Sequence, residues 1–325
     1  MPNERKRHKG KIPMIGGLSI FIGLFAGGLV VPFYITALKI PLFFAFLVLM
    51  LGALDDALSI PAGWRLIIQI LVVLLFLYVS GLRLFSFGNL FFNGEIVFVT
   101  MSGLLTVLAF CAGINAFNMI DGIDGLAALM GLVALVSMGV LFFPSFPDYF
   151  VLCSLFGSSL LAFFFMNLRP FSSKKKFFLG DAGSMFLGFM ISFLLIQASQ
   201  GQLPGAEIVM RPITCVWLIA IPLMDMVYVM LRRACRLQSP IQGDRNHLHH
   251  LLVDLGFSHR NVLFLMGCMA IFFAGVGLWG EIHKIPEGWM FFSYLFFFGF
   301  YLFLAVWLSR RLVKKKFLKV EVDRQ

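Results

Sequence analysis

Residues able to bind a metal ion and a phosphate are concentrated in the stretch Asn115–Leu126, NAFNMIDGIDGL. It holds two asparagines and two aspartates, in a chain that is 60% hydrophobic and only 13% charged. Asn115, Asn118 and Asp121 recur every three residues and therefore lie along one side of a helix. Two glycines would then end that helix, and Asp124 is placed to cap the next one. Capping and interhelical amide bonds are one interpretation. An oxygen-rich pocket for a hard cation such as Mg²⁺ explains the two acids and two amides better.

A pair of adjacent acids, Asp55 and Asp56, ends the apolar segment LGALDD at residues 51–56. At the carboxyl end of a helix, two carboxylates repel each other and the helix dipole. A solvated loop with Arg65 as a partner is the structural interpretation. Because the placement opposes stability, the pair predicts a site for a cation or a substrate.

The stretch FFLGDAGS, residues 177–184, follows the basic run Lys174–Lys176 and opens another apolar segment. A turn of this kind at the start of a helix offers backbone N–H groups and the positive end of a dipole, both of which favour phosphate. Asp181 would offer its carboxylate to a metal ion bound to that phosphate.

Histidines are concentrated in SPIQGDRNHLHHLL, residues 239–252. The side chains of Arg245, His247, His249 and His250 are predicted to donate hydrogen bonds to phosphate near neutral pH. A zinc site is an alternative, but the stretch lacks a cysteine pair and the usual histidine spacing. A simple surface cluster is another. For Asp225, in the preceding apolar segment, a structural pairing and a functional role are equally well supported.

The elements that position these residues are predicted to be membrane-spanning helices. Forty phenylalanines and seventeen methionines among 325 residues exceed what one soluble core would bury. Backbone groups in lipid must bond within their own segment, which favours helices. We therefore expect an all-α integral membrane protein, a polytopic bundle of about ten transmembrane helices. The predicted segments are 14–37, 40–54, 64–82, 96–117, 126–143, 149–168, 184–198, 209–231, 261–281 and 289–308.

Charge fixes the expected orientation of this bundle. With the amino terminus in the cytoplasm, 22 of the 26 lysines and arginines fall in cytoplasmic segments. The clustered acids and histidines then share that face, which predicts a cytoplasmic-face active site with both termini cytoplasmic. A net charge of +10 suits the bilayer and an anionic substrate, and no nucleic acid is expected. We expect one domain over 1–325, with cytoplasmic loops near 1–13, 55–63, 118–125, 169–183 and 232–260 and a basic carboxyl-terminal tail at 309–325.

The motifs resemble those of the polyprenyl-phosphate N-acetylhexosamine-1-phosphate transferases in order and spacing. RKRHKGKIPMIGG at residues 5–17, the acid pair, NAFNMIDGIDGL, FFLGDAGS and HLHH carry the resemblance over nearly the whole chain. It is greatest to the bacterial branch that transfers GlcNAc-1-phosphate from UDP-GlcNAc to undecaprenyl phosphate, giving undecaprenyl-diphospho-GlcNAc and UMP. That reaction initiates a cell-surface polysaccharide. Family members usually carry a further span before the first motif, whereas Met1 here stands almost on it.

The resemblance implies a multi-pass protein of the bacterial inner membrane that depends on Mg²⁺, with Mn²⁺ as a substitute. Asp55 and Asp56 would activate the lipid phosphate, and Asp181 would be the Mg²⁺ ligand. The remaining residues would line the nucleotide-sugar site. Asn118 and Asp121 would lie at the sugar and metal, with Asn118 as a second metal ligand and Asp121 as a third catalytic acid, and Asn115 would also bind substrate. Asp124 would lie near the uridine and Phe178 would pack against the uracil. The diphosphate and sugar would be contacted by Arg245, His247, His249 and His250, and Lys11 would approach the same cleft.

Several alternatives stay open at this stage. The lipid phosphate could attack directly, or an aspartate could first form an acyl-phosphate intermediate. The donor could be another UDP-N-acetylhexosamine or UDP-MurNAc-pentapeptide. The oligomeric state is open, with a homodimer as one alternative. A membrane transporter is the remote alternative, disfavoured because its acids would lie near mid-membrane on repeated halves.

Overall fold

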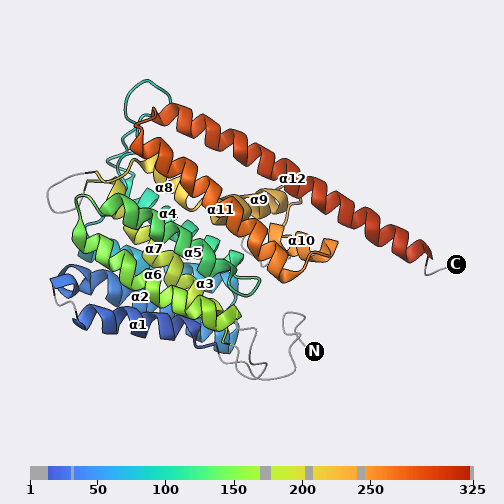
Figure 1. Ribbon diagram of the computed structural model, residues 1–325, viewed down its shortest axis with the longest axis horizontal. Coiled ribbons are helices and arrows are strands. Elements are labelled where there is room, and N and C mark those ends of the chain that lie inside the picture. The colour runs from blue at the N-terminus through green and yellow to red at the C-terminus, as the bar shows by residue number, and fades with distance from the viewer. Residues whose placement is uncertain (1–13, 31–32, 169–176, 202–207, 240–245, 323–325) are drawn as a thin grey trace.

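The computed structural model describes residues 14–30, 33–168, 177–201, 208–239 and 246–322, and these residues form a helical bundle (Figure 1). Within these ranges no strand is present, although Ser86 and Val97 form one antiparallel bridge. The helices are α1 (Gly16–Val30), α2 (Phe33–Leu58), α3 (Ala62–Ser80), α4 (Ser102–Ile120), α5 (Leu126–Phe142), α6 (Pro147–Leu168), α7 (Gly180–Ser199), α8 (Pro212–Leu218), α9 (Ala220–Ala234), α10 (Leu248–Leu255), α11 (His259–Ile282) and α12 (Glu287–Val322).

The prediction of an all-helical, multi-pass membrane protein is confirmed, but the predicted number of about ten spans is not. Seven described helices are long and apolar enough to cross a membrane, or eight if α8 and α9 form one broken span. The ten predicted segments all fall on helices, but α1 and α5 have only 15 and 17 residues. By length and composition, the described residues therefore contain seven or eight candidate spans.

Several predicted boundaries were wrong. The first segment does not run to residue 37, because α2 already begins at Phe33 and continues through Pro41. The fourth segment begins at Ser102 rather than residue 96, since residues 81–101 form an irregular connection. The segment 209–231 is broken near Ile219, where α8 and α9 meet at 83°. Apolar composition alone does not reveal such a break, because the residues on both sides of Ile219 are apolar.

Helix α7 forms the centre of the bundle, since 94% of its most apolar stretch is buried. Small residues let its neighbours approach closely. A Cβ on Gly17 of α1 would lie 2.5 Å from the Cα of Gly183, and one on Gly52 of α2 would lie 2.4 Å from the Cα of Ala182. These contacts hold the start of α7 against the start of α1 and the end of α2.

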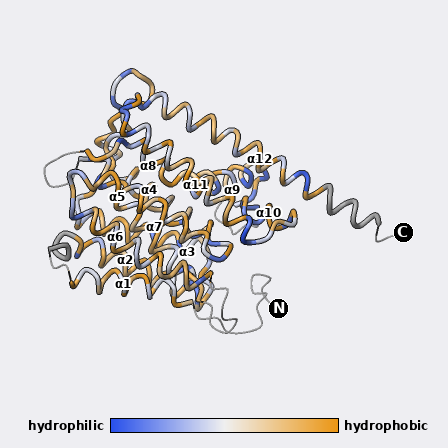
Figure 2. The backbone as a smooth tube through the Cα atoms, viewed as in Figure 1, coloured by the Kyte–Doolittle hydropathy of each residue, from blue (hydrophilic) through white to orange (hydrophobic). Residues whose placement is uncertain are grey.

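Hydrophilic residues gather at the two ends of the bundle. Figure 2 shows mostly hydrophobic helices, with hydrophilic segments around α10 and around the turn that leads into α12. Helix α12 has 36 residues, and the predicted basic tail continues it as a helix to Val322. Its carboxyl-terminal part extends beyond the other helices (Figure 1).

Candidate active site

The two acids that end α2 have different partners. Asp55 is 5% exposed and accepts a hydrogen bond from Arg65 at 2.7 Å and one from the backbone N–H of Ile60 at 2.8 Å. Arg65 therefore is its partner, as the structural interpretation of the pair required, but the carboxylate is buried rather than solvated. The positive charge of Arg65 is thereby held next to the acid pair.

Asp56 binds the start of α7. Its Oδ1 accepts from the backbone N–H of Asp181 at 3.1 Å, and its Oδ2 from that of Ala182 at 3.3 Å. We predicted that these N–H groups would be open to phosphate, and the structure shows that this was wrong. A carboxylate at the positive end of the α7 dipole satisfies them instead. Gly180, with φ of 71°, permits this approach, since a Cβ there would lie 2.6 Å from Oδ2 of Asp56.

Asp181 is joined to α4 through Asn118. The Asn118 amide donates to Oδ1 of Asp181 at 2.8 Å and to the Ser184 hydroxyl oxygen at 3.0 Å. Both Asp55 and Asp56 lie near enough to Asp181 to interact with it electrostatically. Side chains from α2, α4 and α7 thus meet at one place. This agrees with the prediction that the clustered acids share one face of the bundle.

Asp121 and Asp124 follow α4 in the turn before α5, and both are half-buried. Removal from water raises the pKa of Asp121 well above its usual value, and the negative charges of Asp181, Asp56 and Asp124 raise it further. The turn therefore concentrates negative charge that a cation would stabilise.

The histidine segment is fixed by Asp225 of α9. Asp225 is 1% exposed, and its Oδ2 lies 2.7 Å from Nδ1 of His247. Its Oδ1 accepts from the backbone N–H of Leu248 at 2.9 Å and from the Tyr301 hydroxyl at 2.8 Å. Asp225 therefore has structural partners, which are a histidine side chain, the first backbone N–H of a helix and a tyrosine hydroxyl.

His249 connects this segment to the acidic turn. A Cβ on Gly122 would lie 1.9 Å from Nε2 of His249, so only glycine leaves room for the imidazole. His249 is fully buried, and neither ring nitrogen has a hydrogen-bond partner among the described residues. Burial lowers its pKa to about 3, so His249 is neutral near pH 7. A neutral imidazole still carries one ring N–H that can donate a hydrogen bond, as the predicted role toward phosphate requires.

The other predicted site residues are distributed as follows. The Asn115 amide donates to Oε1 of Gln69 at 2.9 Å and to the carbonyl of Cys111 at 2.8 Å, which places it in interhelical bonding. Phe178 is half-buried beside α1, where its carbonyl accepts from the N–H of Gly16 at 3.0 Å. His250 is half-buried, 4.2 Å from His249 between ring centroids. Lys11 and Arg245 lie outside the described residues.

Sequence reasoning missed the supporting residues of the site. Ser184 belongs to the motif FFLGDAGS, but no role was predicted for it. Tyr301 lies in an apolar run that contains no motif. Gly122 was interpreted only as a helix breaker, although its second function is to accommodate His249. Its position between two acids of a polar turn was the available signal.

The donor chemistry fits a hard divalent cation. Carboxylate, amide and hydroxyl oxygens are present around Asp181, Asn118 and Ser184, and thiolates are not among the groups that meet there. However, no three carboxylate, histidine or cysteine side chains within the described ranges converge closely enough to hold an ion by themselves. A bound phosphate would have to complete the coordination, as is usual for Mg²⁺.

Together, the fold and the site define a multi-pass helical membrane protein with an acidic, histidine-flanked site for a phosphorylated substrate at one end of its bundle. Residues 38–199 match the model of glycosyl transferase family 4. The chain belongs to the family of undecaprenyl-phosphate alpha-N-acetylglucosaminyl 1-phosphate transferases, which confirms the resemblance seen in the motifs.

Three relatives illustrate the extent of the match. The Salmonella typhi enzyme of that name is 37% identical over 97% of this chain and 86% of its own length. The Escherichia coli K12 enzyme is 36% identical over the same shares of the two chains. The Haemophilus influenzae enzyme is 36% identical over 97% of this chain and 88% of its own length.

Proposed function

We propose that this protein transfers GlcNAc-1-phosphate from UDP-GlcNAc to undecaprenyl phosphate, giving undecaprenyl-diphospho-GlcNAc and UMP as the first step of a cell-surface polysaccharide. The names of its relatives support the lipid acceptor and the sugar phosphate. The observation that carries the proposal is structural. Asp56, Asn118 and Asp181, from three helices, are joined by hydrogen bonds beside a turn with two further acids.

The reaction replaces one pyrophosphate bond by another. An oxygen of the lipid phosphate forms a bond to the sugar-bound phosphorus of UDP-GlcNAc, and the bond from that phosphorus to the UMP oxygen breaks. Because both reactants are anions, neutralising their charge is the main requirement. A phosphate monoester is mostly dianionic at neutral pH, so no strong base is needed.

This chain's residues would share that work. Arg65, held by Asp55 at 2.7 Å, offers a positive charge beside the acid pair that we assign to the lipid phosphate. The histidine segment would donate hydrogen bonds to the diphosphate and sugar. Asp181 and Asn118 would hold Mg²⁺ or Mn²⁺, which supplies positive charge against the diphosphate oxygens.

The charge distribution along the chain supports a cytoplasmic location for this site. We propose an inner-membrane protein with both termini in the cytoplasm, where nucleotide sugars are available. The first helix lies beside the site, since the N–H of Gly17 donates to the carbonyl of Leu179 at 3.3 Å.

A transferase assay on purified protein tests the proposal. Undecaprenyl phosphate would be incubated with UDP-GlcNAc, UDP-GalNAc or UDP-MurNAc-pentapeptide, and the lipid product and UMP would be measured by mass spectrometry. We expect a diphospho-GlcNAc lipid and an equal amount of UMP, lost on chelation and restored by Mg²⁺ or Mn²⁺ but poorly by Zn²⁺. Full turnover after chelation would refute the metal assignment. Uptake of solute into vesicles without UMP release would instead favour a transporter.

A further inference from the structure

Asp225 is a buried acid that the reaction outlined above does not use. Its carboxylate is 1% exposed on α9, yet it accepts hydrogen bonds from two other parts of the chain. His247 and Leu248 stand at the start of α10, and Tyr301 lies on α12. A buried carboxylate is costly unless such donors surround it. This arrangement therefore ties three helices together through one side chain.

The contact with His247 fixes the chemistry of that imidazole. An ionised carboxylate can only accept hydrogen bonds, so the proton of the pair lies on Nδ1 of His247. The other ring nitrogen, Nε2, is then the atom left for further interactions. A hydrogen bond of this kind orients a functional histidine and selects its tautomer.

The histidine rings form a connected row. The rings of His247 and His249 are nearly parallel, 12° apart, with their centroids 5.5 Å from each other. The ring of His249 in turn lies 4.2 Å from that of His250 and against Gly122 of the acidic turn. Asp225 thus holds His247 at one end of this row, and His249 in the middle of the row contacts the turn between Asp121 and Asp124.

Helix α10 depends on the same carboxylate. It has eight residues, and the N–H of Leu248, its first residue, donates to Asp225 rather than to a side chain of its own segment. His247 precedes this residue without a side-chain cap of its own. Because so short a helix is marginal alone, this bond and the packing of α10 determine where the imidazoles lie.

We propose that Asp225 is a positioning residue, which acts through His247 to hold the histidine row against the acidic turn and so orients the diphosphate of the nucleotide sugar. This inference rests on the proposed transferase function. Tyr301 supports it from α12 by donating to the same oxygen that receives the N–H of Leu248.

A double-mutant cycle tests the proposal. Asp225→Asn keeps the shape of the side chain but can donate to Nδ1 of His247, which would select the other tautomer. We expect kcat/KM for UDP-GlcNAc to fall by about 10- to 100-fold, with a higher KM and a lower kcat. His247→Ala should cause a similar loss, and the double variant should lose no more than His247→Ala alone.

Two further variants separate positioning from general stability. Tyr301→Phe removes one donor, leaves the bond to His247 intact and gives a smaller rise in KM that disappears in the His247→Ala background. It also carries the test if Asp225→Asn does not fold. Glu281→Gln, which disturbs a half-buried acid at the opposite end of the bundle, should lower the melting temperature without changing KM.

The outcomes distinguish the inference from the proposed function. If the wild-type protein makes no lipid product from any UDP-sugar, the transferase proposal fails. If it does, and the losses of Asp225→Asn or Tyr301→Phe and His247→Ala multiply fully in the double variants, Asp225 does not act through His247 and the inference is overturned. Unchanged kinetics in a folded Asp225→Asn protein would overturn it as well.

Discussion

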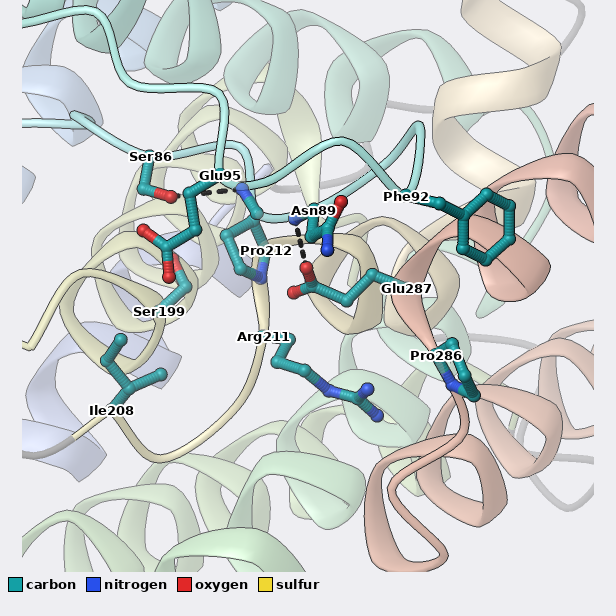
Figure 3. Close-up of a pocket in the computed structure, with 11 residues that line it drawn as sticks. Ser86, Asn89, Phe92, Glu95, Ser199, Ile208, Arg211, Pro212, Pro286 and Glu287 are labelled. Carbon is teal, nitrogen blue, oxygen red and sulfur yellow. Dashed lines mark hydrogen bonds between the residues drawn. The ribbon is translucent and has the colours of Figure 1, made fainter.

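The two ends of the bundle surround their carboxylates differently. At the end where α11 turns into α12, Glu281 accepts from the backbone N–H of Arg211 at 3.2 Å, from its side chain at 3.1 Å and from the Thr214 hydroxyl. Glu287 accepts from the backbone N–H of Asn89. Figure 3 shows this contact beside a pocket of about 310 Å³, which Arg211 and Glu287 help to line.

At the other end, negative charges lie near one another. Asp56 and Asp181 act on Asp121, whose pKa is raised, and His249 is buried without a partner among the described residues. At the first end, Glu281 and Glu287 lie against donors that hold loops and helices together. The second end has more charge than such bonds require, which is typical of a site completed by a substrate or cation.

The largest expected effect follows from removing one charge at the acidic end. Asp181→Asn is nearly isosteric, and the bond from Asn118 can be kept. We expect turnover in the transferase assay to fall by roughly 100- to 1000-fold or more, while the protein stays folded in the membrane. Near-normal turnover of the variant would show that Asp181 is a structural residue. The acidic end would then resemble the opposite end, where the carboxylates only hold the fold together.

A second change tests the contact between the histidine segment and the acidic turn. Gly122→Ala would introduce a methyl group 1.9 Å from Nε2 of His249 and displace the imidazole. We expect kcat/KM to fall by about 100-fold, because displacing this imidazole would misalign the groups that react. Gly157→Ala is the matched control, because nothing lies within 4 Å of its added Cβ. Equal effects of the two substitutions would contradict the role of the contact.

The raised pKa of Asp121 predicts a pH-dependent stability. Because its folded-state pKa lies above the unfolded value of roughly 3.9, its contribution favours folding at low pH and is lost as pH rises through the folded pKa. Asp121→Asn should therefore raise the melting temperature at pH 7 in metal-free buffer, and the difference should shrink as the pH falls toward about 4. Thermal unfolding at several pH values measures this, and a variant less stable than wild type at pH 7 would refute it.

The smallest effect on catalysis is expected at the opposite end. Glu281→Gln removes the charge that faces Arg211 and weakens three hydrogen bonds, so stability should fall by about 1–3 kcal/mol. The kcat and KM of the folded fraction should stay within about two-fold of the wild-type values. A loss of turnover comparable to that of Asp181→Asn would show that the two ends of the bundle are coupled.

From the sequence, the place where acids gather was predicted better than the contacts that these acids make. Adjacent acids at a helix end and a turn with two acids and two amides indicated where negative charge collects, because such residues are costly beside lipid. It did not distinguish Asp55, which pairs with Arg65, from Asp56, which caps α7. Nor did it separate Asn118 from Asn115, since one helical turn decides which amide reaches Asp181 and which reaches Gln69.

The order of residues along the chain is enough to indicate the class of structure and the kind of chemistry. Its long apolar segments require helices in lipid, and the order of its motifs indicates the family. Which groups meet depends on how the helices pack in three dimensions. The bond from Asp225 to His247 and the contact of His249 with Gly122 join residues that are far apart in the chain. Such contacts arise from close packing of helices around α7, and close packing depends on the shapes of all the neighbours at once rather than on any local pattern.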